Sequence, residues 1–117
     1  MAHLVPVFRS VQSGQAEIVL SAVTEAELLV RPYRDDDLDA LERIGGLLDT
    51  EGIRVLPVDR RIGRHSAVLR ARHGLHTADA IIVATAIEAG CDVIVGNDKM
   101  WRRLDEIAYL HLDEIAQ

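Results

Sequence analysis

Three carboxylates stand where a parallel β-sheet would bring them to one edge: Glu27, Asp79 and Asp98. Glu27 lies one helical turn beyond a strand predicted at 17–22. Asp79 lies near the start of an apolar helix, and Asp98 follows the apolar stretch 92–96 by two residues. Crowded carboxylates repel one another unless a cation lies among them, and Mg²⁺ or Mn²⁺ prefers oxygen ligands. Because a bound metal activates water and stabilises charge on a phosphate oxygen, the pattern indicates phosphodiester chemistry.

Each of these acids also has an ordinary structural explanation. Thr24 and Glu27 have the spacing of a capping box, in which the glutamate bonds the backbone N–H of the cap residue. Asp79, in the first turn of a helix, would complement the helix dipole. Asn97 and Asp98 would serve as turn and cap residues. These explanations do not account for the convergence of three acids on one edge of the sheet.

The elements that must position these acids follow from short apolar runs that alternate with longer amphipathic ones, as in β/α units. Consecutive strands joined by helices imply a mainly parallel sheet, because right-handed crossovers place each helix on a sheet face. Ligands bind such sheets beyond the carboxyl ends of the strands. The sequence predicts strands at 17–22, 53–58, 92–96 and 108–112, and helices at 3–13, 24–30, 38–48, 60–73, 77–89 and 99–107.

Turn and cap residues set several of these boundaries. Pro32 is expected to end the helix at 24–30, which leaves 31–37 as a loop. Asp59 is expected to cap the helix at 60–73, and Gly74 to end it.

Composition limits the classes of protein. Of the 117 residues, 49% are hydrophobic and 27% are charged, so we expect one globular domain over 1–117. The formal charge of -6 excludes broad attraction to a polyanion, so nucleic-acid binding would need a local basic face or a bridging metal. Cys91, the only cysteine, excludes an internal disulfide and fits a reducing cytosol. With no signal peptide and no apolar span of about 18 residues, we expect a cytoplasmic protein without membrane contact.

Two strings resemble the motifs of a known family. "SAVTEAELL" (21–29) resembles the second motif of PIN-domain ribonucleases, whose acid falls on Glu27. "HTADAIIVATAIEAGCDVIVGND" (76–98) resembles the third and fourth motifs, whose acids fall on Asp79 and Asp98. The match extends over nearly the whole chain from about Val5. The sequence as a whole is similar to VapC-type toxins of prokaryotic toxin–antitoxin pairs. The motifs taken together and in this order indicate the family, whereas no single motif would do so alone.

The resemblance implies a PIN-like three-layer α/β/α fold and a Mg²⁺-dependent (or Mn²⁺-dependent) endoribonuclease. Its partners would be an RNA substrate, a cognate antitoxin protein and a second copy in a homodimer or higher oligomer. Glu27, Asp79 and Asp98 would hold one or two metal ions, with water as the nucleophile oriented by Asp79 or Asp98. Asn97 would position the strand end, and Thr24 would support Glu27.

The chain departs from the family pattern at its beginning. Family members start with a central strand that ends in an Asp-Thr-Asn or Asp-Ser-Ser type motif, and no such motif occurs here. Residues 3–13 instead look like the family's second helix, so the first, central strand is expected to be missing and the chain to be N-terminally short. Gly96 stands where the family often has Thr, and 99–101 where it often has Asp followed by Phe. The site loses one ligand of about four, so the chain is expected to be a poor or inactive nuclease, and two buried strand edges are expected to be exposed.

Basic residues suggest how RNA would be held. Arg31 and Arg34, on the predicted loop after Glu27, are the preferred substrate contacts, because they lie nearest the acids. A second basic group would be a positive flank for phosphates, or simply the solvated face of a helix. Its arginines are residues 54, 60, 61, 64, 70 and 72.

Two other functions stay open. The first is a non-catalytic PIN-like module that binds RNA or an antitoxin peptide. The second is a phosphoacceptor or phosphatase α/β domain, which lacks the expected Asp at the end of a first strand.

Overall fold

The computed structural model describes residue 14 and the ranges 16–96 and 99–111. The predicted helix at 3–13 therefore lies outside the described residues, as do Asn97 and Asp98. In chain order the elements are β1 (Ile18–Ser21), α2 (Ala22–Arg34), α3 (Leu38–Leu48), β2 (Ile53–Leu56), α4 (Arg60–His73), α5 (Thr77–Glu88), β3 (Val93–Gly96), the 3₁₀ helix η2 (Lys99–Arg103) and β4 (Ala108–His111).

All described strand pairs are parallel, which confirms the predicted α/β fold with parallel pairing. β1 pairs with β2, with Ile18 opposite Ile53 and Ser21 opposite Leu56. β3 pairs with β4, with Val93 opposite Ala108. The two pairs are separate two-stranded sheets, and no strand in the described ranges joins them. Each sheet therefore has strand edges whose backbone groups find no neighbouring strand in this part of the chain.

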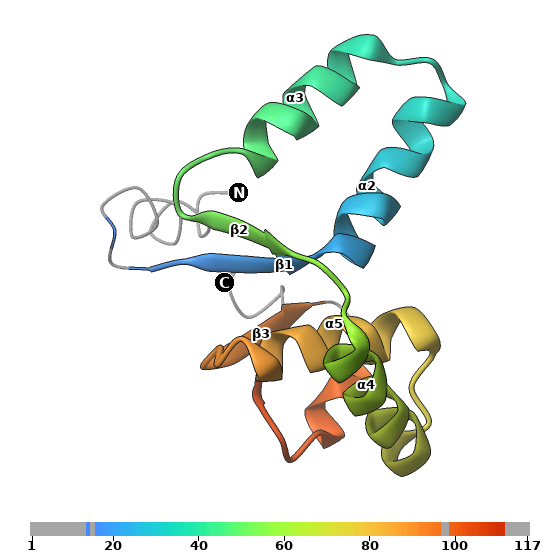
Figure 1. Cartoon of the computed structure of the whole chain (residues 1–117), viewed down its shortest axis with the longest axis vertical. Helices are drawn as coiled ribbons and strands as arrows, with labels where there is room; N and C mark the ends of the chain where they lie inside the picture. The colour runs from blue at the N-terminus through green and yellow to red at the C-terminus, as the bar shows by residue number, and fades with distance from the viewer. Residues whose placement is uncertain (1–13, 15, 97–98, 112–117) are drawn as a thin grey trace.

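The helices lie on opposite sides of the β1–β2 pair (Figure 1). α2 and α3 form an antiparallel hairpin that extends away from the sheet, and they contact β1 and β2 respectively. α4 and α5 pack against each other on the other side, where α5 also contacts β1 and β3. α5 thus links the two sheets.

The buried core lies mainly around α4 and α5. Within α5, Ala80, Val83 and Ala84 are fully buried, which confirms that this helix is covered on most of its surface. The remaining members of the core cluster come from α4, β3, η2 and the connecting segments: Ile62, Leu69, Leu75, Ile94, Trp101, Leu104 and Ile107.

No helix in the described ranges combines the length and apolarity needed to cross a bilayer.

Several helix boundaries arise from the capping residues that the sequence indicated. Asp59 caps α4, where its Oδ1 accepts a hydrogen bond of 2.9 Å from the Ile62 N–H. Gly74 ends α4 in the left-handed conformation at φ 71°, which glycine adopts without a Cβ clash. Both predicted boundaries of this helix are therefore confirmed.

The expected end of the helix before Pro32 is wrong. Pro32 lies buried inside α2, which continues to Arg34. Beyond the proline, the Asp35 N–H donates to the Arg31 carbonyl at 2.9 Å and the Asp37 N–H donates to the Pro32 carbonyl at 2.9 Å. Because these bonds and the burial of the ring offset the missing proline N–H, the helix tolerates Pro32 in its last turn. Residues 31–34 are consequently helical and do not form a loop.

Candidate functional site

Glu27 lies in the second turn of α2, and its placement excludes the capping-box explanation. The helix begins at Ala22, and Ser21 is its N-cap: Ser21 Oγ accepts a hydrogen bond of 3.1 Å from the Val23 N–H. Thr24 is therefore inside the helix, and Glu27 lies six residues beyond the true cap. Glu27 is exposed and has no ion pair or side-chain hydrogen bond with the described residues. Its carboxylate is available for a ligand.

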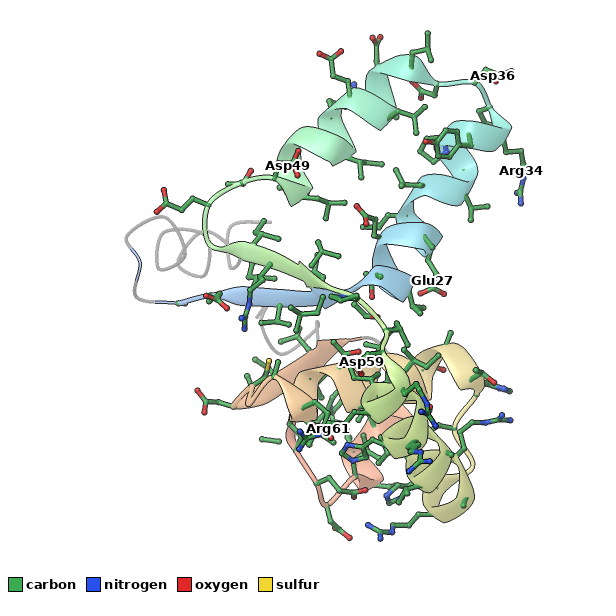
Figure 2. All side chains as sticks on the ribbon, viewed as in Figure 1. Glu27, Arg34, Asp36, Asp49, Asp59 and Arg61 are labelled. Carbon is green, nitrogen blue, oxygen red and sulfur yellow. The ribbon has the colours of Figure 1, made fainter. Side chains whose placement is uncertain are left out.

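One face of α2 carries all four of the predicted residues on this helix. Thr24, Glu27, Arg31 and Arg34 follow one another at three- and four-residue spacing, which places them on the same side of an α-helix. Figure 2 shows Glu27 near the sheet and Arg34 farther along the helix. Arg31 is 89% exposed and lies 3.7 Å from Asp35, a distance typical of a weak surface pair. This face of α2 therefore carries an acid, Glu27, near the sheet and two cations, Arg31 and Arg34, toward the tip of the hairpin.

Asp79 lies in the first turn of α5, whose N-cap His76 makes no side-chain capping bond. The carboxylate is half-buried and has no ion pair within the described ranges. A favourable interaction with the helix dipole accounts for its position equally well, so this alternative stands. α5 contacts α2 and β1, so Asp79 and Glu27 belong to helices that pack against each other.

The third acid, Asp98, and its neighbour Asn97 lie outside the described residues. β3 ends at Gly96, the residue before them, and its parallel partner β4 ends at His111. No group of three or more His, Cys, Asp or Glu side chains within the described ranges is arranged to hold a metal ion. Because Asp98 lies outside these ranges, the three-carboxylate site stays a prediction.

A buried tryptophan follows this segment. Trp101 in η2 is 6% exposed, and its ring meets Tyr109 edge to face with 6.0 Å between centroids. Its indole Nε1 is buried and has no hydrogen-bond acceptor among the described residues. An unpaired buried N–H is costly, so this indole group lowers the stability of the packing around η2.

The second basic group is largely occupied by structural contacts. Arg54 pairs with Glu17 at 3.0 Å, and Arg61 pairs with Glu88 at 2.8 Å. Arg70 and Arg72 also have partners: Arg70 Nε donates to the Leu75 carbonyl at 3.1 Å, and Arg72 lies 3.6 Å from Glu106. Arg60, Arg61 and Arg64 are exposed on α4, which agrees with the explanation that this group includes the solvated face of a helix.

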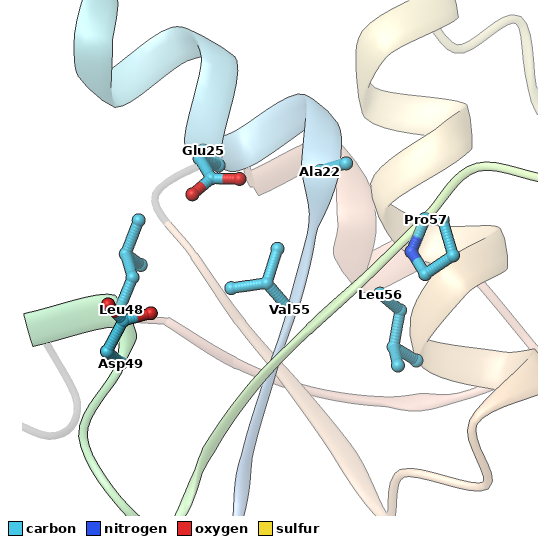
Figure 3. A pocket seen from close by; sticks show the side chains of 7 residues that line it. All are labelled: Ala22, Glu25, Leu48, Asp49, Val55, Leu56 and Pro57. Atoms are coloured by element: carbon cyan, nitrogen blue, oxygen red, sulfur yellow. The ribbon is translucent and has the colours of Figure 1, made fainter. Parts of the chain in front are cut away.

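The sequence did not single out a groove at the carboxyl end of β2. Figure 3 shows Glu25 from the first turn of α2 and Asp49 from the end of α3 beside an apolar floor. The groove is shallow and open to solvent, with a volume of about 450 Å³. No motif could have found it, because its residues come from three elements that meet only in the fold. Its lining consists of Ala22, Glu25, Leu48, Asp49, Val55, Leu56 and Pro57.

Comparison with known proteins agrees with the fold described above. The family model described as "PIN domain" matches residues 6–107. No curated protein matches the sequence.

Several solved structures share the fold. VapBC2 from Rickettsia felis, bound to a DNA fragment from its promoter, superposes with a TM-score of 0.68 at 15% identity, over 81% of this chain and 74% of that one. A toxin–antitoxin complex from Klebsiella pneumoniae gives a TM-score of 0.68 at 18% identity, over 92% and 91%. DNA-bound VapBC from Salmonella typhimurium gives 0.67 at 22% identity, over 93% and 83%.

Proposed function

This chain belongs to the PIN domain family, and from that membership we propose that it is a VapC-like toxin with Mg²⁺-dependent endoribonuclease activity. The metal-binding carboxylates are Glu27, Asp79 and Asp98. The observation that carries this assignment is the position of Glu27: an exposed carboxylate, without a capping role, on a helix that packs against the helix of Asp79. The remaining sequence motif adds Asp98 just beyond β3.

The donor set fits a hard divalent cation. Carboxylate oxygens are the ligands that Mg²⁺ and Mn²⁺ prefer, and no described thiol or imidazole belongs to the set. When bound, such an ion supplies an activated water and stabilises charge on the phosphate oxygen. Glu27 and Asp79 would hold the ion from α2 and α5, and Asp98 would complete the set from the end of β3. Asn97 would fix the backbone at that point.

Substrate contacts come from the same face of α2. Arg31 and Arg34 continue the line of Thr24 and Glu27, so a phosphate chain that passes the acids meets two guanidinium groups along the helix. This local basic stripe allows RNA binding despite the formal charge of -6.

Partners follow from the exposed apolar side chains of the α2–α3 hairpin. Leu28, Val30, Tyr33, Leu38 and Leu47 are between 43% and 75% exposed. Apolar side chains gathered on one hairpin suit an interface with an antitoxin or a second copy. The structural neighbours from R. felis and S. typhimurium are VapBC complexes, which supports an antitoxin partner for this chain. We place this protein in the cytoplasm, where RNA substrates occur.

Cleavage of a structured RNA pool tests the nuclease assignment. We expect slow cleavage that requires Mg²⁺ and stops with EDTA, because three identified acids hold the metal less firmly than four. Asp79→Asn and Asp98→Asn should each lower the rate by at least about tenfold. Asp39→Asn, an exposed acid in the first turn of α3, is the matched control and should cleave like the wild type.

Two results would contradict the nuclease assignment. Cleavage that persists in EDTA, or that is equal in all variants, would show that these carboxylates are not responsible. RNA or peptide binding without any cleavage would favour the non-catalytic module.

A further inference from the structure

We propose that Arg60 and Arg64, on the outward face of α4, form a second contact for the phosphate backbone of RNA. This contact lies across the β1–β2 sheet from Arg31 and Arg34, because α2 and α4 are on opposite sides of that sheet (Figure 1). The inference rests on the proposed function, since it assigns a further contact for the same substrate. The bound strand would cross the end of the sheet, with a pair of arginines on each side.

The fold separates the six arginines of the second basic group into two sets. Four of them contact a glutamate or a backbone carbonyl. The other two, Arg60 and Arg64, are exposed and have no ion pair or side-chain hydrogen bond within the described ranges. They are four residues apart and lie opposite the buried Ile62 and Leu69, so they share the outward face of α4. Both guanidinium groups can therefore bind an anion from solution.

The charges of α4 favour an anionic ligand. The helix has no acidic residue among its 14 positions, and it begins with Arg60 and Arg61. Cations in the first turn of a helix lie at the positive end of the helix dipole, which is an unfavourable arrangement. The preceding acid, Asp59, accepts the capping hydrogen bond from the Ile62 N–H. A bound phosphate would supply the negative charge that the outward face of α4 lacks.

The start of α4 lies at the same end of the sheet as the start of α2. Ser21 and Leu56, the last residues of β1 and β2, are opposite each other in a parallel pair. α2 begins directly after Ser21, and α4 begins four residues after Leu56. Figure 2 shows Glu27 on α2 and Asp59 before α4 near this end of the sheet. An RNA strand that passes Glu27 can therefore extend from the arginines of α2 to those of α4.

The spacing of Arg60 and Arg64 suits neighbouring phosphates of one strand. Side chains four residues apart on a helix are separated by about 5 to 6 Å at Cβ, and each planar guanidinium can bind a phosphate through two parallel hydrogen bonds. α4 carries no Phe, Tyr or Trp on which a base could stack. The contact is therefore to the backbone and independent of base sequence. RNA is favoured over an acidic protein segment because both arginine pairs flank the proposed nuclease acids.

The salt dependence of RNA binding tests the contact. The probe is a fluorescein-labelled oligouridylate of about twelve nucleotides, whose binding is followed by anisotropy in EDTA, where the proposed cleavage does not consume it. Each phosphate contact to a single strand contributes about 0.7 to the slope of log K against log salt concentration. We expect Arg60→Gln/Arg64→Gln to reduce the magnitude of this slope by about 1.4. The variant should weaken binding of oligouridylate and oligoadenylate equally.

The matched control removes the same charge elsewhere. Arg43→Gln/Arg54→Gln changes exposed arginines on α3 and near the start of β2, and it should keep the wild-type slope. The melting temperature of Arg60→Gln/Arg64→Gln should equal or slightly exceed that of the wild type, because the change removes a cation from the positive end of the helix dipole. A lower slope would then report lost contacts and not unfolding.

The outcomes separate this inference from the proposed function. A wild-type slope in Arg60→Gln/Arg64→Gln, together with a lowered slope in Arg31→Gln/Arg34→Gln, would refute the second contact alone. An equal loss in the control variant would also refute it, because the effect would then follow net charge. A wild-type protein that binds neither oligonucleotide, in EDTA or in Mg²⁺, would contradict both proposals. A glutamate-rich peptide that binds as tightly as RNA, and loses affinity in Arg60→Gln/Arg64→Gln, would assign this face to an acidic protein partner.

Discussion

Glu106 binds the ring of His73 through both of its carboxylate oxygens, each 3.0 Å from Nε2. The contact ties the last turn of α4 to the segment before β4, and the side chains are only 14% and 17% exposed. Because an ionised carboxylate only accepts hydrogen bonds, Nε2 of His73 must carry the hydrogen. Burial raises the pKa of Glu106, but the hydrogen bond and charge of His73, together with backbone N–H groups, outweigh it and hold the pKa below its ordinary value.

This lowered pKa predicts a loss of stability in acid. A carboxyl whose pKa is lowered by folding stabilises the native state above its unfolded pKa of about 4.3 and loses that contribution as the pH falls through the folded value. Glu106→Gln should lower the free energy of unfolding by about 1 to 3 kcal/mol near neutral pH and flatten its pH dependence below about pH 4.5. Denaturant unfolding followed by Trp101 fluorescence measures both. Glu51→Gln, at an exposed acid, is the control. Equal pH profiles of stability for the Glu106 variant and the wild type would show that Glu106 is not the source of the stability lost in acid.

The N-cap of α2 supplies a second test. Ser21→Ala should destabilise the protein by about 0.5 to 2 kcal/mol, because it removes the acceptor for the Val23 N–H. Thr24→Ala should be neutral or slightly stabilising, because Thr24 lies inside the helix, where alanine has the higher propensity. The melting temperatures of the two variants show whether Ser21 or Thr24 caps the helix. A larger loss from Thr24→Ala would restore the capping box and with it the ordinary explanation of Glu27.

The contrast between α4 and α2 shows what the sequence could predict. Asp59 and Gly74 define the bounds of α4 through local backbone chemistry, so the sequence alone was sufficient. Pro32 also acts locally, but local backbone hydrogen bonds beyond it and burial of its ring, which depends on tertiary packing, determined the outcome. The candidate site follows the same division. The placement of Glu27 and Asp79 on helices was predictable, whereas Glu25 and Asp49 line one groove only because α2, α3 and β2 come together in the fold.

Metal binding provides a third prediction. Saturating Mn²⁺ should raise the melting temperature modestly, since a ligand at 100 times its dissociation constant adds about 2.7 kcal/mol. It should also quench the fluorescence of Trp101, which follows Asp98 by three residues. Asp79→Asn should abolish both effects, and Asp39→Asn should preserve them. An unchanged wild-type melting temperature in Mn²⁺ would argue against a shared site, and a metal-independent loss of stability in Asp79→Asn would support the helix-dipole explanation.

Self-association is the fourth prediction, and it follows from apolar surface that the described fold leaves uncovered. Tyr33 and Leu38 are 65% and 75% exposed on the α2–α3 hairpin, and the two separate sheets leave strand edges without partners in the described ranges. Burying such surface against a second copy gains about 25 cal/mol per Å², and closed homodimers are the commonest way to do so. Light scattering at micromolar concentration should therefore show a dimer or larger species. Tyr33→Asp/Leu38→Asp should shift it toward monomer, whereas Val68→Asp, at a 47% exposed position on α4, should not. A folded, monodisperse wild-type monomer would refute self-association, and equal disruption by Val68→Asp would place the interface away from the hairpin.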